Sequence, residues 1–265
     1  MTGGPPAADR WFRSFPASRS AAGRLVCFPH AGGAATFFRP LSVLLGPAVA
    51  VVAVQYPGRQ ERRQEAPPAD VGALADTVAE LLSTLGDSPL AFLGHSMGAI
   101  VAFETALRLR DRDAGRAPAA LFCSGRRAPA TSRDECVHRL PDDALVDHVI
   151  ALGGPAAEVL RDEEMRGLLL PTIRSDYRAI ESYRGSPDAR VDIPISVLVG
   201  DRDPLVTRAE ADAWRLHTTK QADLRTFPGG HFYLSREFPA VAAYLRSRLS
   251  HLLAPSAPAG VPGAG

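Results

Sequence analysis

A serine flanked by glycines is the clearest candidate for chemistry in this 265-residue chain. The stretch "PLAFLGHSMGAIVAFETAL" (89–107) places Ser96 between a short apolar run and a helix-like pattern. A turn between a strand and a helix can expose a serine hydroxyl at its tip, and the flanking glycines permit close backbone contacts. A serine hydroxyl is a weak nucleophile unless a base takes its proton. The pattern therefore predicts a nucleophilic serine and calls for a base elsewhere in the chain.

Of the seven histidines, His231 is the best candidate for that base. It follows "LRTFPGG" (224–230), a strand pattern that ends in a Pro-Gly-Gly loop, and it precedes the last helical segment. His95 adjoins the serine, but neighbouring residues on a tight turn point apart, so we expect a structural role for it. A catalytic role is not expected for the histidines in helical patterns, namely His138, His148, His217 and His251.

A catalytic imidazole needs a carboxylate that fixes its tautomer and stabilises its charged form. The stretch "ISVLVGDRDPLV" (195–206) offers Asp201 and Asp203 directly after an apolar run. We favour Asp203 because it lies farther into the loop and because Pro204 stiffens the backbone after it. The chain order serine, aspartate, histidine is that of the α/β-hydrolases, whereas serine proteases of other folds use other orders.

Stabilising the oxyanion that forms during acyl transfer requires two backbone N–H donors. The N–H of Met97, directly after the serine, is the expected first donor. The glycine-rich loop "CFPHAGGAATFF" (27–38) follows an apolar run and is the expected source of the second. Within it we favour the N–H of Ala31, with that of Gly32 as the alternative.

Six short apolar runs predict strands, at residues 24–28, 48–54, 89–94, 119–124, 195–200 and 224–227. Their residues are continuously apolar rather than alternating, which is typical of parallel strands covered on both faces. Helical patterns lie between them, at 73–86, 97–110 and 238–253. The alternation predicts an α/β fold with a mostly parallel central sheet and helices on both faces. Residues 126–190 show only helical patterns, so we expect a helical lid over the carboxyl edge of the sheet, with a longer crossover as the alternative.

We expect one α/β-hydrolase domain at residues 11–252, with disordered ends rich in Pro, Gly and Ala at 1–10 and 253–265. A formal net charge of +1 argues against nucleic acid as a partner. The longest apolar segment is far shorter than the ~20 residues of a membrane span, and no signal-peptide pattern is present. The three cysteines lack the spacing of a disulfide framework or a metal site. We therefore expect a cytoplasmic protein without a bound metal.

Taken together, these motifs closely resemble the type II (stand-alone) thioesterases of polyketide synthases and non-ribosomal peptide synthetases. The resemblance covers roughly residues 11 to 250 and rests on "FPHAGGAATFF", "QYPGRQERRQEAPP", "FLGHSMGAIVAFE", "LPDDALVDHVIALGG", "VGDRDPLV" and "FPGGHFYL". It implies an editing enzyme that hydrolyses aberrant or stalled acyl and aminoacyl groups from the phosphopantetheine arm of carrier proteins. It assigns the catalytic roles to Ser96, Asp203 and His231, and the oxyanion donors to Met97 and Ala31. Where the family more often has Thr-Pro after two glycines, this chain has "GGPAAEVL", which bears on the shape of the lid.

The resemblance implies acyl or peptidyl carrier protein domains as partners, and no cofactor other than the arm that carries the substrate. Candidate contacts for an acidic carrier protein are Arg59, Arg62, Arg63, Arg126 and Arg127, with an ordinary solvated face as the alternative. We expect a monomer. A general esterase or acyltransferase of the same fold is the alternative function, because acyl-serine chemistry is common to all of them.

Overall fold

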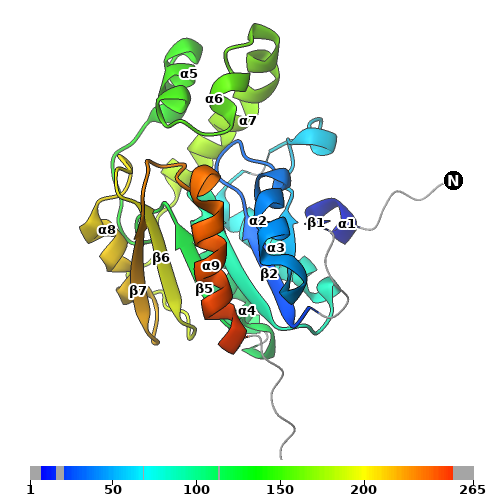
Figure 1. Cartoon of the computed structure of the whole chain (residues 1–265). Helices are drawn as coiled ribbons and strands as arrows, with labels where there is room; N and C mark the ends of the chain where they lie inside the picture. The colour runs from blue at the N-terminus through cyan, green and yellow to red at the C-terminus, as the bar shows by residue number, and fades with distance from the viewer. Residues whose placement is uncertain (1–6, 16–20, 68, 113, 253–265) are drawn as a thin grey trace, which may run out of the picture.

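The computed structural model describes residues 7–15, 21–67, 69–112 and 114–252. Within these ranges seven strands form one sheet in the order β1-β3-β2-β4-β5-β6-β7 (Figure 1). The strands are β1 (Phe12–Ser14), β2 (Gly23–Phe28), β3 (Val49–Val54), β4 (Leu90–His95), β5 (Leu121–Ser124), β6 (Ile195–Gly200) and β7 (Ala222–Phe227). β1 pairs antiparallel with β3, and β2 to β7 pair in parallel. The sheet confirms the predicted fold class.

The inner strands are mostly apolar on both faces because both faces of the sheet are covered. In β2, Leu25 and Cys27 pack into one hydrophobic cluster, whereas Val26 and Phe28 pack into another. All four side chains are fully buried. Successive side chains of a strand point to opposite faces, so a strand between two helical layers needs apolar residues throughout. This explains why continuous apolar runs located six of the seven strands in the described part of the chain.

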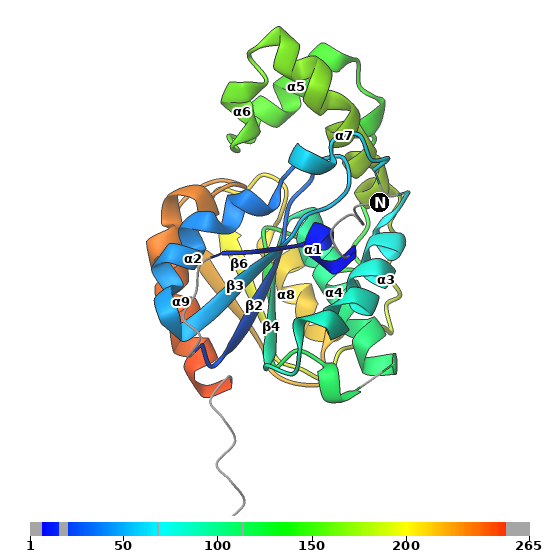
Figure 2. The same ribbon diagram turned by 90° about the vertical axis from the view of Figure 1, so that its right-hand side faces the viewer.

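Helices cover the two faces of the sheet, as Figure 2 shows. One face carries α2 (Arg39–Leu45) and α9 (Leu234–Leu252), and the other carries α3 (Val71–Leu81), α4 (Met97–Arg112) and α8 (Arg208–Asp212). None of the helices in the described part of the chain has the length and apolar character needed to cross a bilayer.

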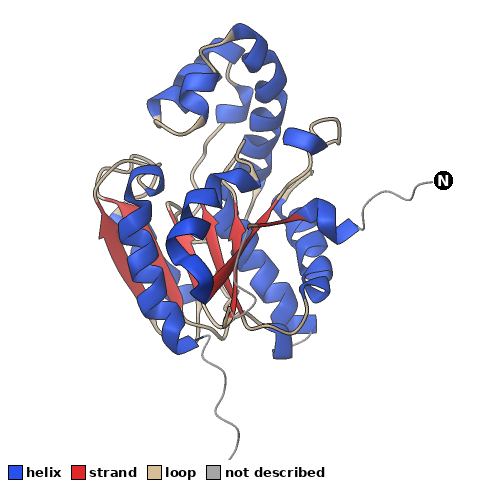
Figure 3. Cartoon of the chain, turned by 45° about the vertical axis from the view of Figure 1, so that its right-hand side comes forward, coloured by secondary structure: helices blue, strands red, loops and turns tan. Residues whose placement is uncertain are grey.

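The insertion expected at residues 126–190 lies between β5 and β6 and carries three helices above the carboxyl edge of the sheet (Figure 3). They are α5 (Asp142–Ala151), α6 (Ala156–Val159) and α7 (Glu163–Ser182). The insertion has a small apolar cluster of its own, made of Leu145, Val146, Val149, Leu160, Leu170 and Ile173. Helix α7 continues from this cluster into the main core, where Ile180 is buried. It therefore connects the lid to the body of the protein.

The N-terminal region is more ordered than its composition indicated. The expectation of disorder at residues 1–10 was wrong for residues 7–10, which belong to helix α1 (Ala7–Trp11). The Arg62 guanidinium lies 4.4 Å from the centre of the Trp11 ring, and Arg10 forms an ion pair with Glu65. These contacts with the segment after β3 hold α1 and the unpredicted edge strand β1 in place. Residues 1–6 and 253–265, also expected to be disordered, lie outside the described residues.

Helix α7 is continuous through Pro171, although an internal proline removes one backbone hydrogen bond. Leu170 and Ile173, on either side of the proline, are both buried in the lid cluster. Apolar packing thus outweighs the lost hydrogen bond. Helix α2 was not predicted from the sequence, because its 7 residues are too few for a clear helical pattern.

The start of α4 packs very closely against the end of β2. A Cβ atom added to Gly98 would lie 2.0 Å from the carbonyl oxygen of Phe28 and 2.6 Å from that of Pro29. Both obstacles are backbone atoms, so a side chain at this position requires the helix to move away from the strand. Only glycine is compatible with this approach.

We predict that Gly98→Ala destabilises the protein by about 3 kcal/mol or more, at the upper end of overpacking effects. Gly167→Ala is the matched control because nothing lies within 4 Å of a Cβ added at this helical position. Helix propensity alone makes the control neutral or slightly stabilising. Thermal unfolding followed by circular dichroism measures both variants. Equal melting temperatures for the two would contradict the close approach of α4 to β2.

Candidate active site

Ser96 lies on a strained turn between β4 and α4. Its φ angle is 53°, in the left-handed region that a non-glycine residue seldom adopts. A Cβ on Gly94 would lie 2.2 Å from the carbonyl oxygen of Gly98, so this turn also requires glycine there. The Ser96 N–H donates to the Ser124 carbonyl of β5 over 2.8 Å. This geometry is that of a nucleophile elbow, which carries the serine hydroxyl beyond the edge of the sheet.

The side chains of Ser96, His231 and Asp203 form a continuous hydrogen-bonded series. Ser96 Oγ lies 3.0 Å from His231 Nε2. His231 Nδ1 lies 2.9 Å from Asp203 Oδ2 and 3.1 Å from Oδ1. Because the carboxylate accepts a hydrogen bond from the Nδ1–H, Nε2 carries no proton and is left to accept from the serine hydroxyl. The arrangement can take a proton from Ser96 as its oxygen attacks an electrophile.

The structure separates the two aspartates that the sequence left as candidates. The Asp203 side chain is fully buried and also accepts from the Leu205 N–H over 2.9 Å. Asp201 is half-exposed and accepts from the Gly229 N–H over 2.8 Å, which ties its loop to the loop that carries His231. Asp203 is therefore the carboxylate that faces the imidazole, and Asp201 braces the backbone nearby.

Two backbone N–H groups are candidates for binding the negative charge that develops on an oxyanion. Among the described residues, no hydrogen-bond acceptor is found for the N–H of Met97 or that of Ala31. The alternative donor is already used, since the Gly32 N–H donates to Asp176 Oδ2 over 2.7 Å. The close packing of Gly98 on Phe28 brings the start of α4 next to the loop that holds Ala31. Ala31 is thus the better candidate for the second donor.

A family model described as "Thioesterase domain" matches residues 23–249, which is most of the chain. The chain belongs to the thioesterase family. Hydrolysis of a thioester is accordingly the activity of this chain. The same fold and the same three side chains serve many acyl-transfer reactions, so the family match narrows what the geometry alone leaves open.

Two relatives of this thioesterase come from species of Streptomyces. The "Probable cadicidin biosynthesis thioesterase" of Streptomyces griseus is 50% identical over 234 residues, which is 88% of this chain but only 64% of that protein. "Thioesterase PikA5" of Streptomyces venezuelae is 44% identical over 229 residues, 86% of this chain and 81% of that protein. Among solved structures, the type II thioesterase BorB from the borrelidin biosynthetic cluster is 43% identical with a TM-score of 0.84, covering 92% of this chain and 100% of that one.

A cavity of about 180 Å³ opens at Ser96 and His231. Lid residues from the segment before α5 and from α5 and α7 form much of its wall, including Val137, Leu152 and Ile180. Phe232 and Leu205 add apolar surface from the core side. Ser96 and His231 therefore line a mostly apolar cavity, and residues of the lid form part of its wall.

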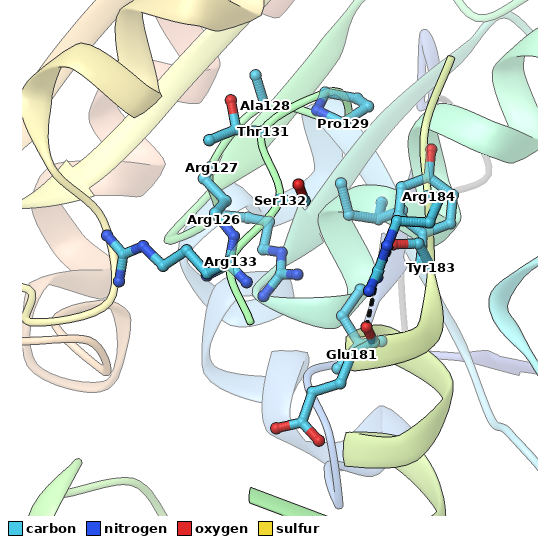
Figure 4. A pocket seen from close by; sticks show the side chains of 12 residues that line it. Arg126, Arg127, Ala128, Pro129, Thr131, Ser132, Arg133, Glu181, Tyr183 and Arg184 are labelled. Atoms are coloured by element: carbon cyan, nitrogen blue, oxygen red, sulfur yellow. Dashed lines mark hydrogen bonds between the residues drawn. The ribbon is translucent and has the colours of Figure 1, made fainter. Parts of the chain in front are cut away.

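Arg126 is the arginine of this cavity that has no carboxylate partner among the described residues. Among the described residues its Nε has no hydrogen-bond partner and no carboxylate is within ion-pair distance of its side chain. Burial lowers its pKa to about 9, and the neighbouring Arg127 acts in the same direction. Figure 4 shows a smaller adjoining pocket, with Arg126, Arg127 and Arg133 on one side and Glu181, Tyr183 and Arg184 on the other.

The arginines expected to contact a carrier protein are mostly unavailable for that role. Arg59 and Arg62 are only 4% and 5% exposed, and their guanidinium groups pair with Asp176 and Glu65. Arg127 is 4% exposed and pairs with Glu135. Arg126 lines the cavity, so Arg63 alone of the five is an exposed surface arginine. Arg59 and Arg62 are therefore not candidates for docking, because their guanidinium groups form internal ion pairs.

Two further histidines, His95 and His30, lie near the His231 imidazole and are buried. The ring centres of His95 and His231 are 5.3 Å apart, and those of His30 and His95 are 5.7 Å apart. His95 Nδ1 lies 3.0 Å from Ser124 Oγ, which lies 2.7 Å from the Tyr233 hydroxyl. Burial lowers the pKa of His30 to about 3 and that of His95 well below its usual range, and the charge of His231 adds to both effects. Both rings are therefore neutral at neutral pH.

Neutral buried histidines make stability depend on pH. The unfolded chain binds a proton at His95 below about pH 6.5, whereas the folded protein does not, so stability falls as pH falls below that value. One such group contributes a slope of up to about 1.4 kcal/mol per pH unit. We predict that His95→Gln makes the unfolding free energy depend less steeply on pH between pH 6.5 and pH 5. Urea denaturation across this range measures the slope, and an unchanged slope would mean that His95 is protonated in the folded protein.

Proposed function

We propose that this thioesterase hydrolyses aberrant or stalled acyl and aminoacyl groups from the phosphopantetheine arm of carrier proteins in polyketide or non-ribosomal peptide biosynthesis. The observation that carries the proposal is the hydrogen-bonded series of Ser96, His231 and Asp203 at the mouth of a lid-walled cavity. The proposal is supported by similar solved structures, which include the type II thioesterase YbtT from the yersiniabactin NRPS/PKS biosynthetic pathway and ClbQ from the colibactin NRPS/PKS pathway. Ser96 is the nucleophile, His231 the base and Asp203 the acid in this proposal.

Acylation begins when Ser96 Oγ attacks the thioester carbonyl carbon and His231 Nε2 takes the hydroxyl proton. Asp203 stabilises the imidazolium that forms. The N–H groups of Met97 and Ala31 donate to the oxyanion, which is the kind of interaction that lowers the barrier most. The carbon–sulfur bond then breaks, the acyl group stays on Ser96 and the pantetheine thiolate takes the proton from His231.

Deacylation repeats these steps with water in place of the serine hydroxyl. His231 takes a proton from the water, the resulting hydroxide attacks the acyl carbon, and the same N–H groups bind the second oxyanion. The ester bond to Ser96 breaks as its oxygen recovers the proton from His231. The free acid leaves, and the enzyme returns to its starting state. This sequence uses only side chains, backbone and water, so we propose that no cofactor is needed.

The cavity suits short acyl groups. Its volume of about 180 Å³ is close to that of an engineered cavity of ~150 Å³ that accepts benzene. Acetyl and propionyl groups fit this space, whereas the whole pantetheine arm exceeds it and must enter from outside. Because the arm must enter from outside, we propose carrier protein domains as the partners. We also propose that the enzyme is cytoplasmic and monomeric.

The proposal is tested by incubating the protein with acetyl- and propionyl-carrier protein and measuring acyl release by intact-protein mass. Wild type is expected to release both acyl groups. Ser96→Ala is expected to stay folded and to lose turnover by orders of magnitude, because no other described hydroxyl lies within hydrogen-bond distance of His231 Nε2. Cleavage of simple esters without release from carrier protein would instead favour a general esterase or acyltransferase.

The two aspartates supply a matched pair for the same assay. Asp203→Asn removes the charge that orients His231 and is expected to lower turnover by orders of magnitude. Asp201→Asn changes a carboxylate two residues earlier in the chain. Among the described residues it contacts only backbone and Arg202, so turnover should stay within a few-fold of wild type. The reverse ranking would assign the acid to Asp201.

A further inference from the structure

Helix α7 of the lid touches the loop that supplies the second oxyanion donor. We call residues 29–34, which follow β2, the oxyanion loop. Ile173 Cγ1 occupies the space beside Gly32, where an added Cβ would meet it at 2.7 Å. Gly32 itself has a φ of 72°, a conformation that keeps the loop tightly folded. The lid helix and the oxyanion loop are thus in direct contact next to Ala31.

A buried carboxylate on the same helix holds the loop from one side. Asp176, which is 2% exposed, accepts a hydrogen bond from the Gly32 N–H over 2.7 Å. The same oxygen forms an ion pair with Arg59. A carboxylate that binds both a backbone N–H and a guanidinium is charged and strongly held, so the position of Gly32 follows that of Asp176.

Arg59 holds the loop from the other side. Its Nε donates to the Gly33 carbonyl over 3.3 Å, and its Nη1 donates to the Pro57 carbonyl over 2.6 Å. Its guanidinium carbon lies 5.2 Å from the centre of the buried Tyr56 ring. Arg59 therefore fixes the carbonyl of Gly33 while its partner carboxylate fixes the N–H of Gly32.

We propose that Asp176 is a positioning residue that sets the direction of the Ala31 N–H through the peptide of Gly32. Because Asp176 belongs to the lid helix, the oxyanion site is correctly formed only when α7 is seated on the core. This inference rests on the proposed function only for the choice of acyl-carrier protein as substrate, because the contact between Asp176 and Gly32 is independent of that function. An ion pair that merely fastened the lid would leave the reaction at Ser96 unchanged once the protein had folded.

Paired substitutions separate positioning from folding. Removing Asp176 alone leaves Arg59 buried without a partner, which strongly destabilises proteins. The test therefore compares R59M/D176N with R59M/D176L, both of which lack the buried charges. Asn keeps an oxygen that accepts from the Gly32 N–H, whereas Leu does not. Thr172→Val is the control for lid attachment, because Thr172 on α7 donates to the Gly58 carbonyl over 3.0 Å without contacting the oxyanion loop.

The measurements are kcat and KM for acetyl-carrier protein and for p-nitrophenyl acetate, with melting temperatures for every variant. We expect R59M/D176L to have a kcat at least 10-fold below that of R59M/D176N on both substrates, with KM changed less than threefold. Loss of one oxyanion donor typically costs ~10²–10³ in turnover, which sets the upper limit. Thr172→Val should retain kcat within about threefold of wild type.

Equal kcat values for the Asn and Leu variants, both folded, would overturn the positioning role. A fall in kcat for Thr172→Val as large as that for the Leu variant would also overturn it, since general lid attachment would then explain both. Wild-type activity on p-nitrophenyl acetate but not on carrier protein would count against the proposed function alone. The ester rates of the variants would still decide the role of Asp176.

Discussion

The contact between Gly98 and the end of β2 determines the geometry on which the rest of the site depends. Without a side chain at this position, α4 begins against the carbonyls of Phe28 and Pro29. Met97 at the start of the helix and Ala31 in the following loop then lie on adjoining segments. The same turn forces Ser96 into its left-handed conformation and directs its hydroxyl away from the sheet. One close backbone approach thus brings the nucleophile and both proposed oxyanion donors together.

The sheet edge and the lid together form the site. Parallel strands deliver Ser96, Asp203 and His231 to one edge, because each residue lies in a loop after the carboxyl end of its strand. Helix α7 then adds a wall to the cavity and a carboxylate, Asp176, that holds Gly32. Chemistry and substrate enclosure therefore share one element, and movement of the lid bears on both.

Local patterns were sufficient to predict the six parallel strands of the sheet and the three side chains of the hydrogen-bonded series. Continuous apolar runs mark strands buried on both faces, and glycines next to Ser96 mark a turn that only a few residue types permit. Long-range contacts were not predictable. Arg59 was a candidate for a surface contact in the sequence, although its ion-pair partner Asp176 lies 117 residues away. A local pattern of apolar and polar residues carries no information about such a long-range ion pair.

The most direct test of the proposed chemistry is rapid acid quenching of the wild-type enzyme during turnover of acetyl-carrier protein, followed by peptide mass mapping. We expect an acetyl group on the peptide that contains Ser96, present during turnover and absent once the substrate is consumed. Acyl release at full rate with no acetylated Ser96, or with the acetyl group on another residue, would contradict catalysis through an acyl-serine at the turn between β4 and α4.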